Sequence, residues 1–157
     1  MRTVLIVEDY DDVRGMLKLL LESEKFRVVE AASGGEALEV IKDHRPDAIL
    51  MDLALPGLDG FETIRRIRAI DAFQNTPIIV LTAYTGPSTY DAALRAGTNF
   101  LMGKPVDFDQ LAALLKRVLF EGNWRNARHN RAASQRAMLR EKPMVPPRGG
   151  RELHYSV

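Results

Sequence analysis

Five polar side chains stand at the ends of short apolar runs, where a folded chain can present them to a ligand. They are Glu8 and Asp9 after TVLIV, Asp52 after DAILM, Thr82 after PIIVL, and Lys104 after NFLMG. A carboxylate that is buried alone is costly, so Asp52 needs a hydrogen-bond partner, a bound cation or an opening to solvent. Carboxylates without thiolate or imidazole suit a hard divalent cation such as Mg²⁺, and a carboxylate can also attack phosphorus to form an acyl phosphate.

The apolar pattern predicts the elements that must position these side chains. Short runs with the length and β-branched content of strands alternate with stretches whose apolar residues recur on one helical face. Ser33 with Glu36, and Asp107 with Gln110, have the spacing of helix capping boxes. The predicted strands are residues 3–7, 26–31, 47–51, 77–81 and 99–102. The two clearest helical faces are Val13, Met16, Leu17, Leu20 and Leu21, and Leu111, Leu114, Leu115, Val118 and Leu119.

Five strands that alternate with five helices predict a doubly wound α/β domain built on a five-stranded parallel sheet. Each crossover helix must bury its apolar stripe, so both faces of the sheet are covered. Ligands of such sheets bind beyond the carboxyl ends of the strands, at the point where the strand order reverses. We therefore expect the five polar side chains to point into one crevice.

Composition limits the class of protein. A chain of 157 residues with 46% hydrophobic content can bury one sizeable core, and we expect no second folded domain. The count of Cys 0 removes disulfides, thiolate metal sites and cysteine nucleophiles, which agrees with a reducing compartment. The amino terminus, MRTVLIVEDYDD, is neither a signal peptide nor a membrane span. We therefore expect a cytoplasmic protein that has no membrane partner.

The basic residues are concentrated after residue 120. Residues 121–157 hold eight Lys+Arg and three Asp+Glu, a net charge of +5, whereas the rest of the chain holds 14 and 18, a net charge of −4. This shift, with the stretch PMVPPRGG, predicts a domain at residues 1–122 and a basic tail at residues 123–157, flexible or partly helical. A flexible tail or a helix that docks on a partner ranks above nucleic-acid contact, because a basic run is usually solvated.

Four motifs carry a resemblance to a known family. VEDYDD, MDLALPGLDG, LTA and GKP, in this order, resemble the receiver domain of bacterial two-component response regulators, from about Arg2 to Phe120. The resemblance implies a flavodoxin-like sheet with strand order 2-1-3-4-5, as in single-domain chemotaxis regulators. It also implies a signalling switch that accepts a phosphoryl group from a histidine kinase or a histidine phosphotransfer protein and acts on a downstream protein target. Such a switch is not an enzyme in the usual sense, although it catalyses its own phosphorylation and can catalyse its own dephosphorylation.

The same resemblance implies a role for each polar residue. Asp52 matches the phosphorylated aspartate, Thr82 the switch hydroxyl and Lys104 the phosphate-binding lysine. It leaves open a homodimer through the fourth helix, fifth strand and fifth helix. The implied ligands of Mg²⁺ are Glu8, Asp9, Asp52 and the backbone carbonyl of Ala54.

Three positions depart from the family pattern. The family commonly carries an aromatic residue three positions before the lysine, where this chain has Leu101 with Phe100 beside it. Ala54 and Tyr84, each two positions past a site residue, flank the path that attacking water takes in the family. The readout of phosphorylation and the lifetime of the phosphoryl group therefore stay open.

Other interpretations compete with the receiver. A phosphohydrolase of the haloacid-dehalogenase type also uses an aspartate and Mg²⁺, but it normally carries a second aspartate where this chain has Ala54. A phosphorylation-independent pseudo-receiver that only binds partners would not need the complete set of acids, hydroxyl and lysine. Taken singly, Glu8 and Asp9 could instead cap the first helix, and Lys104 could lie on a solvated turn.

Overall fold

The computed structural model describes residues 1–121, which form one parallel sheet with helices on both faces. Five strands lie in the order β2-β1-β3-β4-β5, and every neighbouring pair is parallel. The doubly wound fold and the strand order predicted from the sequence are both confirmed. The strands are β1 (Thr3–Val7), β2 (Arg27–Ala31), β3 (Ala48–Asp52), β4 (Ile78–Thr82) and β5 (Phe100–Gly103).

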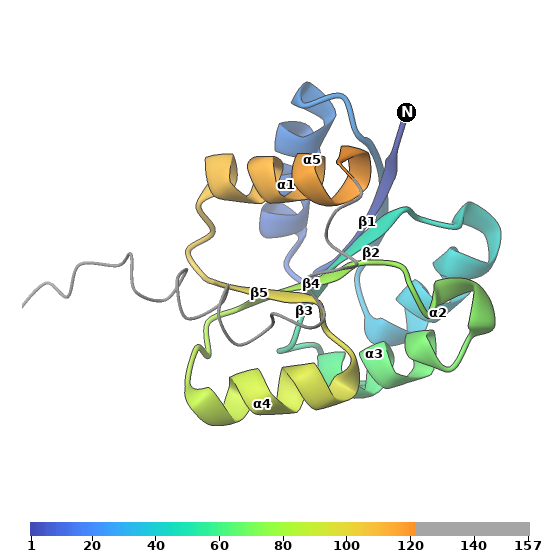
Figure 1. Ribbon diagram of the computed structural model, residues 1–157, viewed down its shortest axis with the longest axis vertical. Helices are drawn as coiled ribbons and strands as arrows, with labels where there is room; N and C mark the ends of the chain where they lie inside the picture. Colours follow the sequence, from blue (N-terminus) through green and yellow to red (C-terminus); the bar gives the residue numbers. More distant parts are fainter. Residues whose placement is uncertain (122–157) are drawn as a thin grey trace, which may run out of the picture. The chain divides into compact units, whose positions relative to one another are not determined.

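The helices form two layers, with α1 and α5 on one face of the sheet and α2, α3 and α4 on the other (Figure 1). Both predicted capping residues are used, because the side chains of Ser33 and Asp107 accept hydrogen bonds from the backbone N–H of Glu36 and Gln110. The helices are α1 (Asp11–Ser23), α2 (Gly34–His44), α3 (Gly60–Arg68), α4 (Pro87–Ala96) and α5 (Phe108–Phe120), with a short 3₁₀ helix, η1 (Asp71–Phe73).

The carboxyl ends of the inner strands carry polar residues inside the ladder. The sequence pattern ends the third and fourth strands at the last apolar residue, but the ladder pairs Asp52 with Leu81 and Thr82 with Gly103. Backbone pairing is indifferent to side-chain polarity, so the strands continue by one residue. Asp52 and Thr82 are therefore held by the sheet itself and not by a loop.

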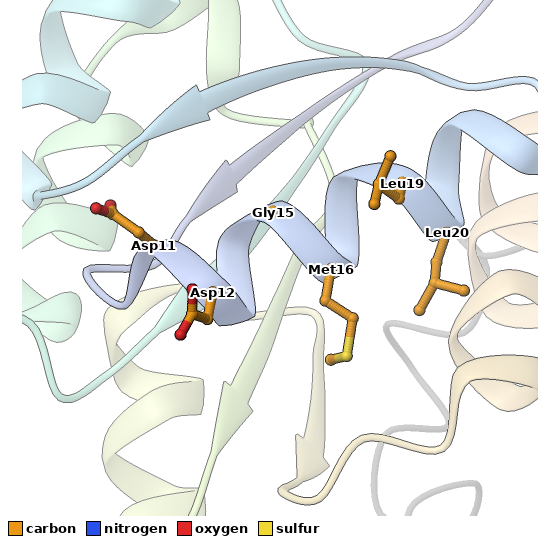
Figure 2. Close-up of a pocket in the computed structure, with 6 residues that line it drawn as sticks. All are labelled: Asp11, Asp12, Gly15, Met16, Leu19 and Leu20. Atoms are coloured by element: carbon orange, nitrogen blue, oxygen red, sulfur yellow. The ribbon is translucent and has the colours of Figure 1, made fainter.

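One prediction about α1 is wrong. Leu17 and Leu21 are buried, as expected for the apolar face, but Met16 is 52% exposed. Met16 is one of the residues that line a shallow open hollow of about 640 Å³ along α1 (Figure 2). The hollow is lined by Asp11, Asp12, Gly15, Met16, Leu19 and Leu20. A helix packed on a sheet buries a narrow stripe, and the residues at the margin of that stripe stay in contact with solvent.

Within residues 1–121, no helix is long and apolar enough to cross a membrane. The predicted tail at residues 123–157 lies outside the described residues, and its boundary with the domain stays a prediction.

Candidate functional site

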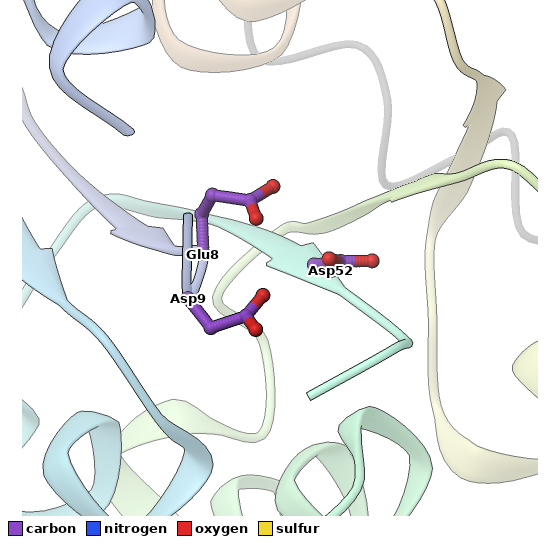
Figure 3. A group of neighbouring side chains, drawn as sticks. All are labelled: Glu8, Asp9 and Asp52. Atoms are coloured by element: carbon purple, nitrogen blue, oxygen red, sulfur yellow. The ribbon is translucent and has the colours of Figure 1, made fainter. Parts of the chain in front are cut away.

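Three carboxylates meet at the carboxyl ends of β1 and β3. Glu8 and Asp9 follow β1 directly, Asp52 is the last residue of β3, and one oxygen of each lies within 4.8 Å of the others. Figure 3 shows the side chains of Glu8 and Asp9 pointing to the same side, toward Asp52. Glu8 is 2% exposed and Asp52 is 5% exposed. Like charges this close repel one another, so the cluster needs positive charge from another source.

The start of α3 packs tightly against the end of β3 and so places Asp52. A Cβ atom added to Gly60 would lie 2.5 Å from the backbone oxygen of Asp52 and 2.7 Å from Cα of Leu53, so only glycine permits this approach. The turn between them uses Gly57 with φ of +71°, a conformation that glycine adopts without strain. The side chain of Asp52 is held as well, because its Oδ1 accepts a hydrogen bond from the N–H of Ala54 at 3.1 Å.

Lys104 supplies the positive charge. Its ammonium Nζ lies 2.9 Å from Oε2 of Glu8 and 3.2 Å from Oδ2 of Asp52. The backbone N–H of Lys104 donates to the carbonyl of Thr82 at 2.8 Å, which ties the lysine to the end of β4. Burial lowers the pKa of Lys104, but the hydrogen bond that its ammonium donates to Glu8 and the charges of Asp52 and Glu8 outweigh burial and leave the pKa raised. The side chain is therefore an ammonium at neutral pH and not a solvated surface lysine.

Asp9 has an unusual environment for a carboxylate. Its Oδ1 is buried without a hydrogen-bond partner among the described residues. The interpretation of Asp9 as a helix cap does not hold, because the N-cap residue of α1 is Tyr10, which makes no side-chain capping bond. A buried carboxylate oxygen without a donor, close to two other carboxylates, matches the donor set that hard divalent cations prefer. The residues thus fit a Mg²⁺ ion.

The remaining predicted residues differ in how far solvent reaches them. Thr82 is buried, and its hydroxyl accepts a hydrogen bond from the N–H of Tyr84 at 3.1 Å. Ala54 is exposed and Tyr84 is 65% exposed, so both lie where solvent reaches. Leu101 is partly buried and packs against the hydrophobic core.

Sequence reasoning missed Arg14, which lies on α1 and contacts the loop that carries the carboxylates of Glu8 and Asp9. Its Nη1 donates to the backbone carbonyl of Glu8 at 2.8 Å, and its side chain is 16% exposed. No spacing in the sequence indicates this contact, because it joins a helix residue to the backbone of the preceding loop.

Comparisons with known proteins agree with this geometry. The family model for the response regulator receiver domain matches residues 4–116. The chain is 40% identical over 122 residues to the transcriptional regulatory protein AfsQ1 of Streptomyces coelicolor. That match covers 78% of this chain and 53% of AfsQ1, so the chain spans about half the length of that relative.

Two solved structures are similar along almost their whole length. Chemotaxis protein CheY4 of Vibrio cholerae has a TM-score of 0.73 at 33% identity, covering 76% of this chain and 99% of that one. The receiver domain of sensor histidine kinase PA1611 of Pseudomonas aeruginosa PAO1 was solved with a magnesium ion coordinated in the active site cleft. It has a TM-score of 0.69 at 36% identity, covering 74% of this chain and 95% of that one.

The chain therefore belongs to the response regulator receiver domain family of two-component systems. Receiver domains are signalling switches, generally not classed as enzymes, that bind Mg²⁺ at an acidic pocket. They act with a histidine kinase or a phosphotransfer protein and with downstream effectors.

Proposed function

We propose that this chain is a switch that accepts a phosphoryl group on the carboxylate of Asp52 in a Mg²⁺-dependent reaction. The observation that carries the proposal is the position of Asp52 at the end of β3, between a carboxylate that has a buried, unpartnered oxygen, Asp9, and the ammonium of Lys104. A purely structural carboxylate at Asp9 would have closed its hydrogen bonds. Asp52 combines a fixed orientation with a neighbouring site for positive charge.

The reaction balances with these groups. An oxygen of Asp52 attacks phosphorus, the bond from phosphorus to the donor's nitrogen or oxygen breaks, and the donor leaves with that electron pair. The product is an acyl phosphate on Asp52. The negative charge of the acyl phosphate needs hydrogen-bond donors. The ammonium of Lys104 and the N–H of Ala54 contact the reacting carboxylate, and the hydroxyl of Thr82 stands at the end of the neighbouring strand β4.

Mg²⁺, when bound, supplies neutralisation of the phosphoryl oxygens, and we propose that Glu8, Asp9, Asp52 and the backbone carbonyl of Ala54 hold it. The magnesium ion in the receiver of the Pseudomonas kinase supports this assignment by similarity. Lys104 pairs with Glu8 and Asp52 before reaction. Because a phosphoryl group carries more negative charge than a carboxylate, Lys104 is expected to exchange a carboxylate partner for it.

The phosphodonor, the location and the partners follow from this function and are proposals. The phosphodonor is a histidine kinase or a histidine phosphotransfer protein, and the chain catalyses its own phosphorylation. A cytoplasmic location follows from the proposed donor. A homodimer through α4, β5 and α5 and a role of residues 123–157 in partner binding are expectations, with nucleic-acid contact ranked below them. The haloacid-dehalogenase alternative finds no support, because Ala54 offers no second carboxylate for acid–base catalysis.

Labelling with a small phosphodonor tests the function. The chain is incubated with Mg²⁺ and acetyl phosphate, and any added phosphate is located by mass spectrometry. We expect the label on Asp52 and no label on a folded Asp52→Asn variant, because the amide keeps the size and loses the nucleophile. Asp59→Asn is the matched control, because Asp59 lies on the same stretch of chain and asparagine also caps a helix. Undiminished labelling of Asp52→Asn would refute the assignment.

A further inference from the structure

Arg14 ties the loop after β1 to two other elements. Its guanidinium donates from Nη1 to the carbonyl of Glu8 at 2.8 Å and from Nη2 to Oδ1 of Asp11. Its Nε lies 3.5 Å from Oε1 of Glu30, on β2. One planar group therefore contacts the loop backbone, the first turn of α1 and the neighbouring strand.

The carbonyl of Glu8 belongs to the peptide that leads into Asp9. The N–H on the other side of Glu8 is already bound to the carbonyl of Ala31 at 3.1 Å. Once Arg14 also holds the carbonyl, the plane of the Glu8–Asp9 peptide has little freedom to rotate. That plane fixes the N and Cα atoms of Asp9, from which its side chain leaves the backbone.

Asp9 needs such support because no ion pair within residues 1–121 opposes the repulsion on its carboxylate. Its Oδ1 has no hydrogen-bond partner in the described part of the chain, and the carboxylates of Glu8 and Asp52 lie within 4.8 Å. The ammonium of Lys104 pairs with Glu8 and Asp52, and no ion pair with Asp9 is found among residues 1–121. Repulsion therefore favours a swing of Asp9 out of the crevice.

We infer that Arg14 is a positioning residue, which holds the backbone of Glu8 and Asp9 so that the carboxylate of Asp9 is preorganised for a divalent cation. The inference rests on the proposed cation site. Arg14 touches neither the reacting carboxylate nor the place of the ion. It acts through the peptide that it holds.

The direction in which Mg²⁺ affinity changes when Arg14 is removed distinguishes a positioning role from simple electrostatics. Removal of a positive charge near the crevice would by itself favour a cation, so charge alone predicts that loss of Arg14 tightens Mg²⁺ binding. Loss of preorganisation predicts weaker binding. Mg²⁺ demands near-ideal octahedral geometry while Ca²⁺ accepts flexible geometry, so Mg²⁺ affinity should fall more than Ca²⁺ affinity.

Lys18 provides a matched control. It lies one turn further along α1, and its Nζ is 2.7 Å from Oε2 of Glu30, the carboxylate that Arg14 also faces. Among residues 1–121, its hydrogen bond and ion pair run to Glu30 and not to the loop after β1. Lys18→Met thus removes the same charge and an ion pair to the same strand, but it leaves the carbonyl of Glu8 in place.

The experiment is calorimetric titration of Mg²⁺ and Ca²⁺ into the full chain and into Arg14→Met and Lys18→Met, with thermal unfolding of each in the absence of metal. We expect Arg14→Met to weaken Mg²⁺ binding about tenfold, the low end of the range for groups that orient metal ligands, and Ca²⁺ binding less. Lys18→Met should change both by less than about twofold. If Arg14→Met fails to fold, Arg14→Lys keeps the charge and loses the fork that reaches two acceptors, and it should show the same loss of preference for Mg²⁺.

The outcomes also separate this inference from the proposed function. If the unaltered chain binds no Mg²⁺ and takes no label on Asp52, the proposed function fails. If the unaltered chain binds Mg²⁺ but the Arg14 and Lys18 variants behave alike, or if Mg²⁺ and Ca²⁺ weaken equally in the Arg14 variant, the positioning role alone is overturned.

Discussion

Two polar clusters lie at opposite ends of the sheet, and they differ in how completely their charged groups are paired. At the amino ends of β4 and β5, the guanidinium of Arg68 is surrounded by oxygen acceptors from four places in the chain. The acceptors are the backbone carbonyls of Gly97, Phe73 and Thr76 and Oδ1 of Asn99, at 2.9, 2.6, 2.7 and 2.7 Å. Oδ1 of Asn99 also accepts a hydrogen bond from the N–H of Ile78 at 2.9 Å, which joins the cluster to the first residue of β4.

The carboxyl ends of β1 and β3 show the opposite arrangement. Three carboxylates face one ammonium, and an oxygen of Asp9 is buried without a donor from the part of the chain that the structure describes. The excess negative charge lowers stability unless a cation is bound. Arg68 thus stabilises the fold by donating hydrogen bonds to nearby acceptors, whereas the crevice holds excess negative charge that a bound cation can neutralise. The difference indicates that function lies at the cluster whose charges and hydrogen bonds the fold itself does not pair.

Removing a carboxylate from the crevice should produce the largest effect. Asp9→Ala is expected to weaken Mg²⁺ binding about 100-fold or more, because even groups that only orient metal ligands cost about 10–100-fold when lost. Without metal, the same variant should be more stable by about 1 kcal/mol, the repulsion of two unit charges 4 Å apart in water. Calorimetric titration and urea unfolding measure the two quantities.

The control for this variant is Asp12→Ala, which removes an exposed carboxylate from the first turn of α1 outside the three-carboxylate cluster. It should leave Mg²⁺ affinity nearly unchanged. Equal Mg²⁺ affinity in Asp9→Ala and the unaltered chain would break the comparison, because the crevice would then be no metal site.

Removing the donor from the satisfied cluster should change stability and not metal binding. Arg68→Met leaves buried acceptors without a partner and is expected to cost about 2 kcal/mol in the free energy of unfolding. Arg66→Met, on the same helix, removes an exposed ion pair with Glu62 and should cost less than about 0.5 kcal/mol. Urea unfolding gives both values, and Mg²⁺ titration of the folded variants should match that of the unaltered chain. A lower Mg²⁺ affinity in Arg68→Met than in the unaltered chain would show that the two ends of the sheet are coupled.

Truncation after Gly122 should have the smallest effect. Both polar clusters lie between Glu8 and Lys104, and α5 ends at Phe120, so we expect the unfolding free energy to change by less than about 0.5 kcal/mol and the labelling rate to stay the same. Collapse of the truncated chain, or loss of its labelling, would place residues 123–157 within the folded unit and contradict the proposed boundary.

The sequence by itself determined the elements and the set of residues at the strand ends. Apolar runs of strand length, alternating with helical stripes, require a parallel sheet, and the carboxyl ends of parallel strands meet at one edge. Asp52, Thr82 and Lys104 could therefore be expected in one crevice with the acids that follow β1. The motifs added a role for each residue, and those roles remain to be tested by labelling.

Only the tertiary structure decided how the polar groups are paired. The ammonium of Lys104 reaches Glu8 across 96 residues, and Arg68 reaches Gly97 and Asn99 across 29 and 31 residues. The exposure of Met16 and the contact of Arg14 with the carbonyl of Glu8 likewise depend on how α1 lies against the sheet. The physical reason is that local periodicity records which side of an element faces the core. A hydrogen bond or an ion pair depends instead on distances of about 3 Å between elements, which are set only when the whole sheet and its helices have packed.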